Sequence, residues 1–494
     1  MRAAALTIAA GVAFACVPAA AQDLPTLRGA VAEEDINNEL LGGAASQSPF
    51  GDEEEARPRQ SRQQRRAAAA QAAEAEEVSA ATRTPTATSE DPERNQRAAA
   101  DAIRTGAIEG RGAGPEENPF DPVGLRLGTF TVRPRLDQGI GWTSNANSSE
   151  DGKSSTYSET ALRLNAISDW SRHSATVDAG LNWRKSISGK KIDEPEGGIN
   201  GELRLDLGGD INAVAGAGYR VREDSASSPS LVAGVADRPL RHTLTGIVGV
   251  TRDIARFRFG LTGDVSRNFY GDAKLDDGSV VSQAERDSTL ATAKLRLGYE
   301  IFPAIRPFIE AEAGRRFYDE TRDSAGYERS ADRYALRTGV ELDLREKLTG
   351  EISGGWLTER PDDDRLASIS GFVTAGRLSW SPVRGTRVDL NAATEVEGTT
   401  SAGETGSLLY TGSVEVNHQL RSNLTGRAAV GLEYRDYAAS DARDTVLWGE
   451  AGLTWWLNRY AGITGRARHE VQRSNLPGRD YDETSVYLGT TFQR

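Results

Sequence analysis

Residues 130–143 read FTVRPRLDQGIGWT, and apolar side chains recur there on alternate positions. Phe130, Val132, Leu136 and Trp142 fall on one face of an extended strand, while the intervening positions carry Thr, Arg, Asp and Gly. The stretch therefore predicts a β-strand with one apolar face and one polar face.

The same alternation continues from residue 120 to the C-terminus and marks about 18 strands. One late apolar stripe includes Val388 and Val396, and the next includes Leu408 and Tyr410. Each stripe predicts the apolar face of a strand.

The connections between the predicted strands alternate in length. Residues 208–210 and 458–459 are short turns, whereas residues 185–200 and 222–239 are long polar loops. This alternation predicts antiparallel strands, with tight turns at one end of the sheet and long loops at the other. An even number of strands places both ends of the sheet's chain on the side of the turns.

A soluble β-sandwich would show the same alternation of apolar and polar residues. The residue content of each face therefore decides between a soluble sandwich and a membrane barrel. Charged residues crowd the polar face and are nearly absent from the apolar face, as acyl chains require, because Arg or Lys at mid-bilayer costs about 2–4 kcal/mol. Aromatic residues such as Trp142, Trp356 and Trp380 fall near predicted strand ends, where a membrane interface favours them. We therefore expect an all-β fold, a closed antiparallel transmembrane β-barrel of about 18 strands. Closure pairs the first strand with residues 485–493.

The N-terminus predicts export. Arg2 precedes an apolar run over residues 3–17, and three alanines at residues 19–21 suit cleavage, so residues 1–21 form a predicted signal peptide. Cys16, the only cysteine, lies inside it; a lipoprotein would use Cys16 as its first mature residue, but Phe14 suits that processing poorly. The expected location is the cell outer membrane of a Gram-negative bacterium.

Residues 22–117 form a low-complexity stretch with acidic, arginine-rich and alanine-rich runs and no apolar periodicity. Such a composition buries too little surface to offset the entropy of ordering, so we predict a disordered periplasmic segment. A solvated spacer is the simplest interpretation, and docking to peptidoglycan or a partner stays open. The mean hydropathy of −0.51, with no helix-length apolar stretch after the signal, excludes a helical membrane protein.

Charged residues on the polar face are the candidate site residues. Basic side chains gather in the first eight predicted strands, and acidic ones in the later strands. Two interpretations stay open: opposed walls that set a transverse field across a constriction, or charges that merely pair and solvate the interior. The pore-lining candidates are Arg133, Arg135, Arg204, Arg220, Arg256, Arg258, Arg296, Glu341, Asp343, Asp389, Glu395 and Glu415.

The sequence offers little support for catalysis. The period-two alternation places three of the four histidines, His242, His418 and His469, on the apolar face near strand ends, and His173 falls in a predicted turn. All four therefore lie away from any nucleophile that they could activate. Acidic pairs alternate with arginines, so charge pairing explains them more simply than acid–base work. We expect no enzyme activity, no cofactor, no metal and no nucleic-acid partner. The expected partners are outer-membrane lipids, the barrel assembly machinery and a transported solute or polysaccharide.

Residues 118–130, NPFDPVGLRLGTF, are followed by an Arg-Pro within the strand, by WTSN at residues 142–145 and by WSRH at residues 170–173. In these motifs the chain resembles the putative β-barrel porin 2 family over residues 118–494. The resemblance implies an outer-membrane barrel and transfers no functional residue, because the motifs mark strand starts and turns. One departure is the C-terminus, where Phe492 is followed by Gln493 and Arg494, whereas outer-membrane proteins usually end on an aromatic residue.

The leading functional hypothesis is a passive pore for small hydrophilic solutes, because a barrel of this strand number encloses an aqueous channel. The long N-terminal segment motivates an alternative, the outer-membrane barrel of a polysaccharide export system. A plugged anchoring barrel is the third possibility. The sequence alone does not decide among them.

Overall fold

The computed structural model describes residues 119–494, except residues 226–227, 231–234, 276, 345–346 and 400–403. The predicted signal peptide and the predicted disordered segment lie outside the described residues. Within the described part of the chain, no helix has the length and apolar character needed to cross a membrane.

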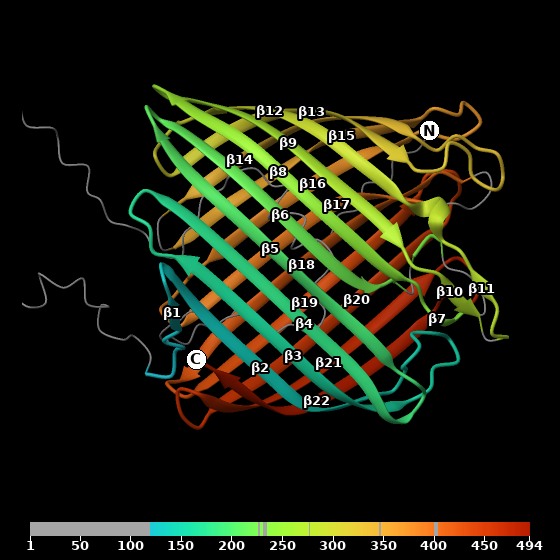
Figure 1. The fold of residues 1–494 in the computed structure, drawn as a ribbon, viewed down its shortest axis with the longest axis horizontal. Coiled ribbons are helices and arrows are strands. Elements are labelled where there is room, and N and C mark those ends of the chain that lie inside the picture. Colours follow the sequence, from blue (N-terminus) through green and yellow to red (C-terminus); the bar gives the residue numbers. More distant parts are fainter. Residues whose placement is uncertain (1–118, 226–227, 231–234, 276, 345–346, 400–403) are drawn as a thin grey trace, which may run out of the picture. The chain divides into compact units, whose positions relative to one another are not determined.

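Eighteen long strands build the wall of the barrel (Figure 1). Their bounds are β2 Phe130–Thr143, β3 Ser155–Ser168, β4 His173–Gly189, β5 Asp193–Gly208, β6 Ile211–Glu223, β8 Leu240–Ile254, β9 Phe257–Tyr270, β12 Ser288–Tyr299, β13 Ile305–Tyr318, β14 Ala331–Asp343, β15 Leu348–Pro361, β16 Ile369–Trp380, β17 Thr386–Gly398, β18 Gly406–Arg421, β19 Leu424–Tyr437, β20 Arg443–Trp456, β21 Ala461–Ser474 and β22 Tyr481–Gln493. The short elements are β1 Leu125–Leu127, β7 Val235–Asp237, β10 Ala273–Leu275, β11 Val280–Val281 and the 3-10 helix η1 Ala284–Arg286.

Each wall strand pairs antiparallel with the next, and β2 pairs with β22 to close the circuit. The closing ladder runs from Arg135 opposite Gln493 to Thr143 opposite Ser485. The predicted fold class, the strand count and the predicted pairing of the first strand with residues 485–493 are therefore confirmed.

The two ends of the barrel differ, and we call them the turn end and the loop end. Tight connections such as residues 209–210 and 255–256 lie at the turn end, where the C-terminus sits near β1 (Figure 1). The loop end carries the longer connections, including the small sheet of β7, β10 and β11.

The predicted loop over residues 185–200 is wrong. The strands β4 and β5 continue through it and leave only residues 190–192 as the connection. Lys185 opposite Asp193 is still a ladder pair. The period-two signal fades because polar residues and glycines interrupt the apolar face of this hairpin tip, whereas the backbone ladder does not depend on side-chain polarity.

The barrel wall exposes apolar side chains and buries polar ones, which is the reverse of a soluble protein. Ile140 and Leu488, which lie opposite each other on β2 and β22, are 57% and 65% exposed. Their neighbours Asp137 and Thr491, also a cross-strand pair, are 3% and 0% exposed. Exposed apolar and buried polar side chains on alternate positions are what a barrel wall in a bilayer requires.

The ladder between β16 and β17 is incomplete. Only six residue pairs join these strands, from Ala375 opposite Ala393 to Trp380 opposite Val388, and the loop-end half of β17 pairs with β18 alone. At the point of separation, the backbone N–H of Thr374 donates to the hydroxyl of Thr394 at 2.9 Å. A side chain therefore takes the place of the next backbone acceptor.

Beyond that point, the β17–β18 edge packs against the inner faces of β14, β15 and β16. Val396 and Leu408 join Leu357, Ile369 and Val373 in a buried apolar cluster that also includes Ala335. The expectation that the stripes containing Val396 and Leu408 lie on an exposed apolar face is therefore wrong at these two residues. The overlap of the two sheet edges covers them with protein.

Candidate functional site

The inner face of the barrel carries ion pairs between strands that are not neighbours. Arg296 on β12 donates to Glu351 on β15 at 2.7 Å, and Arg258 on β9 donates to Glu341 on β14 at 3.2 Å. Strands three positions apart are separated by roughly 14 Å on a flat sheet, because neighbours lie about 4.8 Å apart. Their side chains converge on the concave side of a closed sheet, so these charged groups point inward.

A second group of inner ion pairs spans the closure of the barrel. Arg466 on β21 donates to both carboxylate oxygens of Glu159 on β3 at 2.8 Å, across β22 and β2. Nearby, Arg427 donates to Glu415 at 2.7 Å and to Glu450 at 2.6 Å. Bidentate and shared pairs of this kind fix long side chains in place, so the inner wall is both charged and ordered.

At the loop end, the connection between β6 and β8 reaches inward. Arg286 of η1 lies 2.8 Å from the carboxylate of Asp224, and its guanidinium lies 3.8 Å from the centre of the Tyr270 ring. Arg286 also donates to the hydroxyl of Ser228 at 3.4 Å. A guanidinium held by a carboxylate and an aromatic face anchors this part of the connection.

The same connection contacts the segments that follow β17 and β21. Arg479, between β21 and β22, donates to the carbonyl oxygen of Ser228 at 3.1 Å, to the Tyr437 hydroxyl at 2.7 Å and to Asp444 at 3.0 Å. Thr399, beyond β17, donates to the carbonyl oxygen of Pro229 at 3.4 Å. Residues 228–230 are thus held by chain segments from distant strands of the wall.

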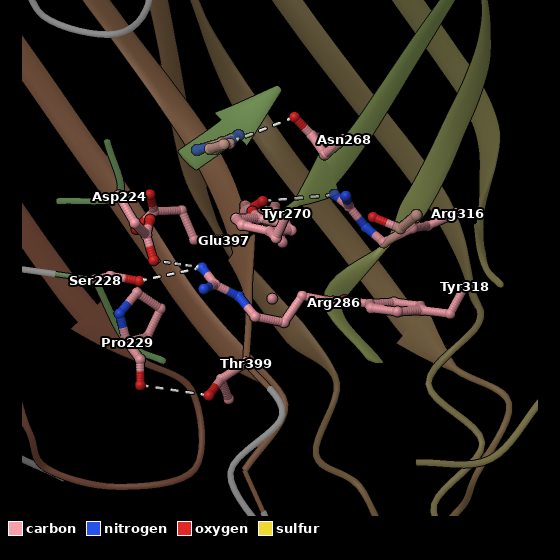
Figure 2. A pocket seen from close by; sticks show the side chains of 14 residues that line it. Asp224, Ser228, Pro229, Asn268, Tyr270, Arg286, Arg316, Tyr318, Glu397 and Thr399 are labelled. Carbon is pink, nitrogen blue, oxygen red and sulfur yellow. Dashed lines mark hydrogen bonds and ion pairs between the residues drawn. The ribbon is translucent and has the colours of Figure 1, made fainter. Parts of the chain in front are cut away.

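These contacts border a small, mostly polar pocket, which we call the mouth site. Its lining comes from the β6–β8 connection, from β8, β9, η1, β12 and β13, and from the end of β17 that leaves β16 (Figure 2). The lining residues are Asp224, Ser228, Pro229, Arg241, Asn268, Tyr270, Arg286, Ser288, Arg316, Tyr318, Val396, Glu397, Gly398 and Thr399.

The displaced end of β17 completes the mouth site. Arg316 on β13 donates to the carbonyl oxygen of Val396 at 3.5 Å and to the carboxylate of Glu359 at 2.6 Å. A side chain on Gly398 would collide with the hydroxyl of Tyr318, so glycine permits this close approach of β17 to β13. Glu397 accepts hydrogen bonds from Arg435 at 2.9 and 2.6 Å.

Two carboxyl groups of the connecting segments titrate differently. Burial raises the pKa of Asp224, but the charge and hydrogen bond of Arg286 outweigh it and hold the pKa below its ordinary value. Burial raises the pKa of Asp287, which also accepts a hydrogen bond from the backbone N–H of Tyr270. Asp224 therefore keeps its charge in acid longer than an ordinary aspartate.

Most of the predicted pore-lining residues lie within strands at polar positions. These are Arg133, Arg135, Arg204, Arg220, Arg258, Arg296, Glu341, Asp389, Glu395 and Glu415. Arg256 instead lies exposed in the turn between β8 and β9, and Asp343 is the exposed last residue of β14. That any of them lines an open channel stays a prediction.

The structure brings few of these residues together directly. Arg258 meets Glu341, whereas Asp389 pairs with Arg387 on its own strand and Arg204 pairs with Glu202. From β9 to β15, the predicted basic and acidic stretches meet as ion pairs, which favours the pairing interpretation in that part of the wall.

Sequence reasoning missed the residues that build the mouth site. Arg286, Arg479 and Thr399 lie in connections, where the period-two pattern says nothing about direction. The one signal available was the density of Arg, Asp and Ser in the long connections, which is also typical of solvated loops.

Three of the four histidines lie within hydrogen-bonding distance of a hydroxyl group. His242 lies 2.8 Å from the hydroxyl of Tyr219 and stacks on Phe269 at 4.7 Å, while His418 and His469 each contact a threonine. His173 begins β4 rather than lying in a turn, because the ladder of β4 and β5 starts there. In the described ranges, no cluster of three or more His, Cys, Asp or Glu side chains suits a metal ion.

A family model described as "Putative beta-barrel porin 2" matches residues 118–494, which is the whole barrel. The chain belongs to this family. Members of the putative β-barrel porin 2 family are outer-membrane β-barrels, and the predicted family is thereby confirmed.

Solved structures similar to this porin 2 family chain share little sequence identity with it and have low TM-scores. The FrpB iron transporter from Neisseria meningitidis is 9% identical, with a TM-score of 0.36, over 69% of this chain and 62% of FrpB. OpdO from Pseudomonas aeruginosa is 11% identical, with a TM-score of 0.37, over 74% of this chain and 97% of OpdO. The chain thus spans less than two thirds of FrpB. No curated protein sequence matches the chain.

Proposed function

We propose that the chain is a porin-like passive channel through which small hydrophilic solutes cross the outer membrane. The observation that supports this most is the inner face, where charged side chains are ordered by ion pairs such as Arg296 with Glu351 and Arg466 with Glu159. Such a face is wetted and presents hydrogen-bonding groups to a polar solute, and a barrel of 16–18 strands leaves room for water. No energy input is needed.

In this proposal, the mouth site forms the narrowest section. The segments that enclose it come from the β6–β8 connection, from η1 and from the end of β17, and all lie at the loop end. Short turns of outer-membrane barrels face the periplasm, so the loop end faces the outside and receives incoming solute. The exposed apolar belt contacts the lipids of the outer membrane.

Planar-bilayer conductance of the purified full-length chain tests the proposal. The wild type is expected to give stable single-channel steps. The variant Arg479→Ala removes the contacts to Ser228 and Tyr437, so a wider mouth and a larger conductance are expected. Arg473→Ala is the matched control, because Arg473 is an exposed arginine on β21 that pairs with Asp482. A chain that inserts into the bilayer without conducting contradicts the proposal.

A further inference from the structure

The inner face of β15 and β16 is apolar at the point where β17 leaves the wall. Leu357, Ile369 and Val373 are at most 3% exposed, and they alternate with exposed outer residues such as Phe372. They are buried because Val396 and Leu408 lie over them. Inner-facing apolar residues are therefore kept from water only while the β17–β18 edge covers them. We call this the overlapped arrangement.

Val396 and Leu408 belong by sequence to the outer faces of their strands. They are cross-strand partners in the β17–β18 ladder. Val396 has the same parity as Val388, which pairs with the exposed Trp380 on the outer face. The same two side chains thus suit two apolar surroundings: lipid outside the wall, and the cluster inside it.

The ladder between β16 and β17 can be extended without a bulge. Continuing the register that joins Trp380 to Val388 and Ala375 to Ala393 puts Phe372 opposite Val396. Phe372 is 53% exposed on the outer face, so Val396 would face lipid beside it. The extension also pairs the loop-end edge of β16, and lipid favours paired edges. We call this the paired arrangement.

Each arrangement satisfies one requirement and leaves another unmet. In the overlapped arrangement the apolar cluster is buried, but the loop-end half of β16 has no ladder partner on the side of β17. In the paired arrangement the edge gains its ladder, but Leu357, Ile369 and Val373 lose their cover. Opposed gains of this kind give a packed edge two discrete positions rather than a continuous range.

The overlapped arrangement is the one that narrows the mouth site. Residues 396–399 line the mouth site only because the end of β17 has left the wall. Arg329, between β13 and β14, holds that end by donating to the carbonyl oxygens of Thr399 and Glu404 at 2.5 and 2.7 Å. Extending the ladder would return the end of β17 to the wall and widen the mouth.

We propose that the loop-end half of β17, with the part of β18 paired to it, is a gate that moves between the overlapped and the paired arrangements. The two strands move together because their ladder is complete to Gly398 opposite Gly406. This proposal rests on the proposed function, because the gate sets the width of the channel's mouth. The overlapped arrangement is the narrow state, and the paired arrangement is the wide state.

A pair of cysteines tests whether the paired arrangement is reached. Cys16, the only cysteine, is replaced by serine so that introduced cysteines react only with each other. Phe372→Cys with Val396→Cys forms a disulfide only in the paired arrangement, because the two side chains now lie on opposite faces of β16.

The matched control is Leu378→Cys with Leu390→Cys, which are opposite each other in the existing ladder. The two cysteine pairs occupy the same type of ladder position, because an even number of residues separates them along the strand. The full-length chain is refolded into lipid vesicles, its folding is verified by heat-dependent gel mobility, and a thiol oxidant is added. The test pair is expected to oxidise at a rate at least one tenth of the control's.

Gly371 offers a variant that acts on one arrangement only. A Cβ atom there would lie 2.5 Å from Cδ1 of Leu408 and 3.3 Å from the Tyr410 hydroxyl, so Gly371→Val opposes the overlap. In the paired arrangement the same side chain would point into the interior of the barrel. Disulfide formation by the test pair is expected to rise at least fivefold, and single-channel conductance to increase. Gly180→Val on β4 is the matched control, since no atom lies within 4 Å of its Cβ position, and no change is expected.

Three results would overturn the gate. The first is no disulfide in the test pair, with or without Gly371→Val, while the control pair oxidises. The second is an equal yield in the Gly371→Val and Gly180→Val backgrounds. The third is a disulfide that leaves the conductance of the channel unchanged.

Oxidation of the test pair is measured without any current, so the two proposals fail separately. A chain that forms the disulfide but never conducts overturns the channel and supports the movement of β17. A chain that conducts but never forms the disulfide supports the channel and overturns the gate.

Discussion

The barrel is joined differently at two of its junctions. The strands β2 and β22, from opposite ends of the barrel chain, share nine residue pairs, whereas the consecutive strands β16 and β17 share six. At the first junction, the ion pair of Arg466 with Glu159 reinforces the ladder. At the second, an apolar cluster around Leu357 replaces the missing ladder and moves the end of β17 to the mouth site. Proximity in sequence therefore does not set the strength of a junction in a closed sheet.

The cluster at the β16–β17 junction is expected to carry the largest single-residue effect. Leu357 is 1% exposed there, and Leu357→Ala is expected to lower the free energy of unfolding by about 3 kcal/mol, because a cavity remains. Leu336→Ala is the matched control, since Leu336 is 55% exposed on the outer face and lipid fills the space. Urea unfolding in lipid vesicles, followed by tryptophan fluorescence, measures both. Equal losses would show that the cluster is not a core.

The β2–β22 junction is tested by removing one charge. Glu159→Gln leaves Arg466 with a weaker partner, and a loss of about 2 kcal/mol is expected because the carboxylate is nearly buried. Asp169→Asn breaks an exposed pair with Arg126 and should change the unfolding free energy by less than about 0.5 kcal/mol. The same urea titration applies, and a loss for Asp169→Asn that matches the loss for Glu159→Gln would contradict the assigned role of the inner pair.

The point where β16 and β17 separate offers a smaller test. Thr394→Val removes the acceptor of the Thr374 backbone N–H, and a loss of about 1 kcal/mol is expected. Thr374→Val removes only the hydroxyl contact between the two side chains and leaves the N–H paired, so a smaller loss is expected. If the two variants unfold at the same urea concentration, the side chain of Thr394 does not stand in for the ladder.

The wall of the barrel follows from the sequence because lipid imposes one rule on every strand. Alternation at residues 130–143 predicts β2, and the need to pair every edge in lipid predicts its partner over residues 485–493. The rule weakens where polar residues and glycines interrupt the apolar face, and for that reason residues 185–200, the tip of the hairpin of β4 and β5, were predicted as a loop. Val396 obeys the alternation yet is covered by neighbouring strands, which a periodicity cannot reveal.

The mouth site could not be predicted in the same way. Arg286, Asp224 and Arg479 meet across connections that are distant in sequence, and their direction depends on the closed wall around them. The period-two alternation assigns Glu395 and Arg258 to the polar face of their strands. It carried no information about which charges meet, because an arginine on a concave wall can reach a carboxylate three strands away.

The smallest expected effect concerns pH and acts on the mouth site, leaving both junctions intact. Arg286, Arg241 and Arg222 face Asp224, and Arg286 outweighs burial to hold the pKa of Asp224 below the ordinary value of 3.8. A depressed carboxyl pKa stabilises the contact above the ordinary value, and the contribution is lost as the pH falls through the lower, folded value. Conductance is therefore expected to rise below about pH 3.8, with little change in the unfolding of the barrel.

Conductance recorded from pH 7 to pH 3 checks this expectation. Asp224→Asn should show the acid level of conductance already at neutral pH, because the ion pair with Arg286 is absent at every pH. Asp287→Asn tests whether a change in conductance above pH 3.8 comes from Asp287, since burial raises the pKa of that carboxyl group. If conductance in the wild type changes only above pH 3.8, the contact of Asp224 with Arg286 does not set the width of the mouth. The displaced end of β17 would then be the element that limits it.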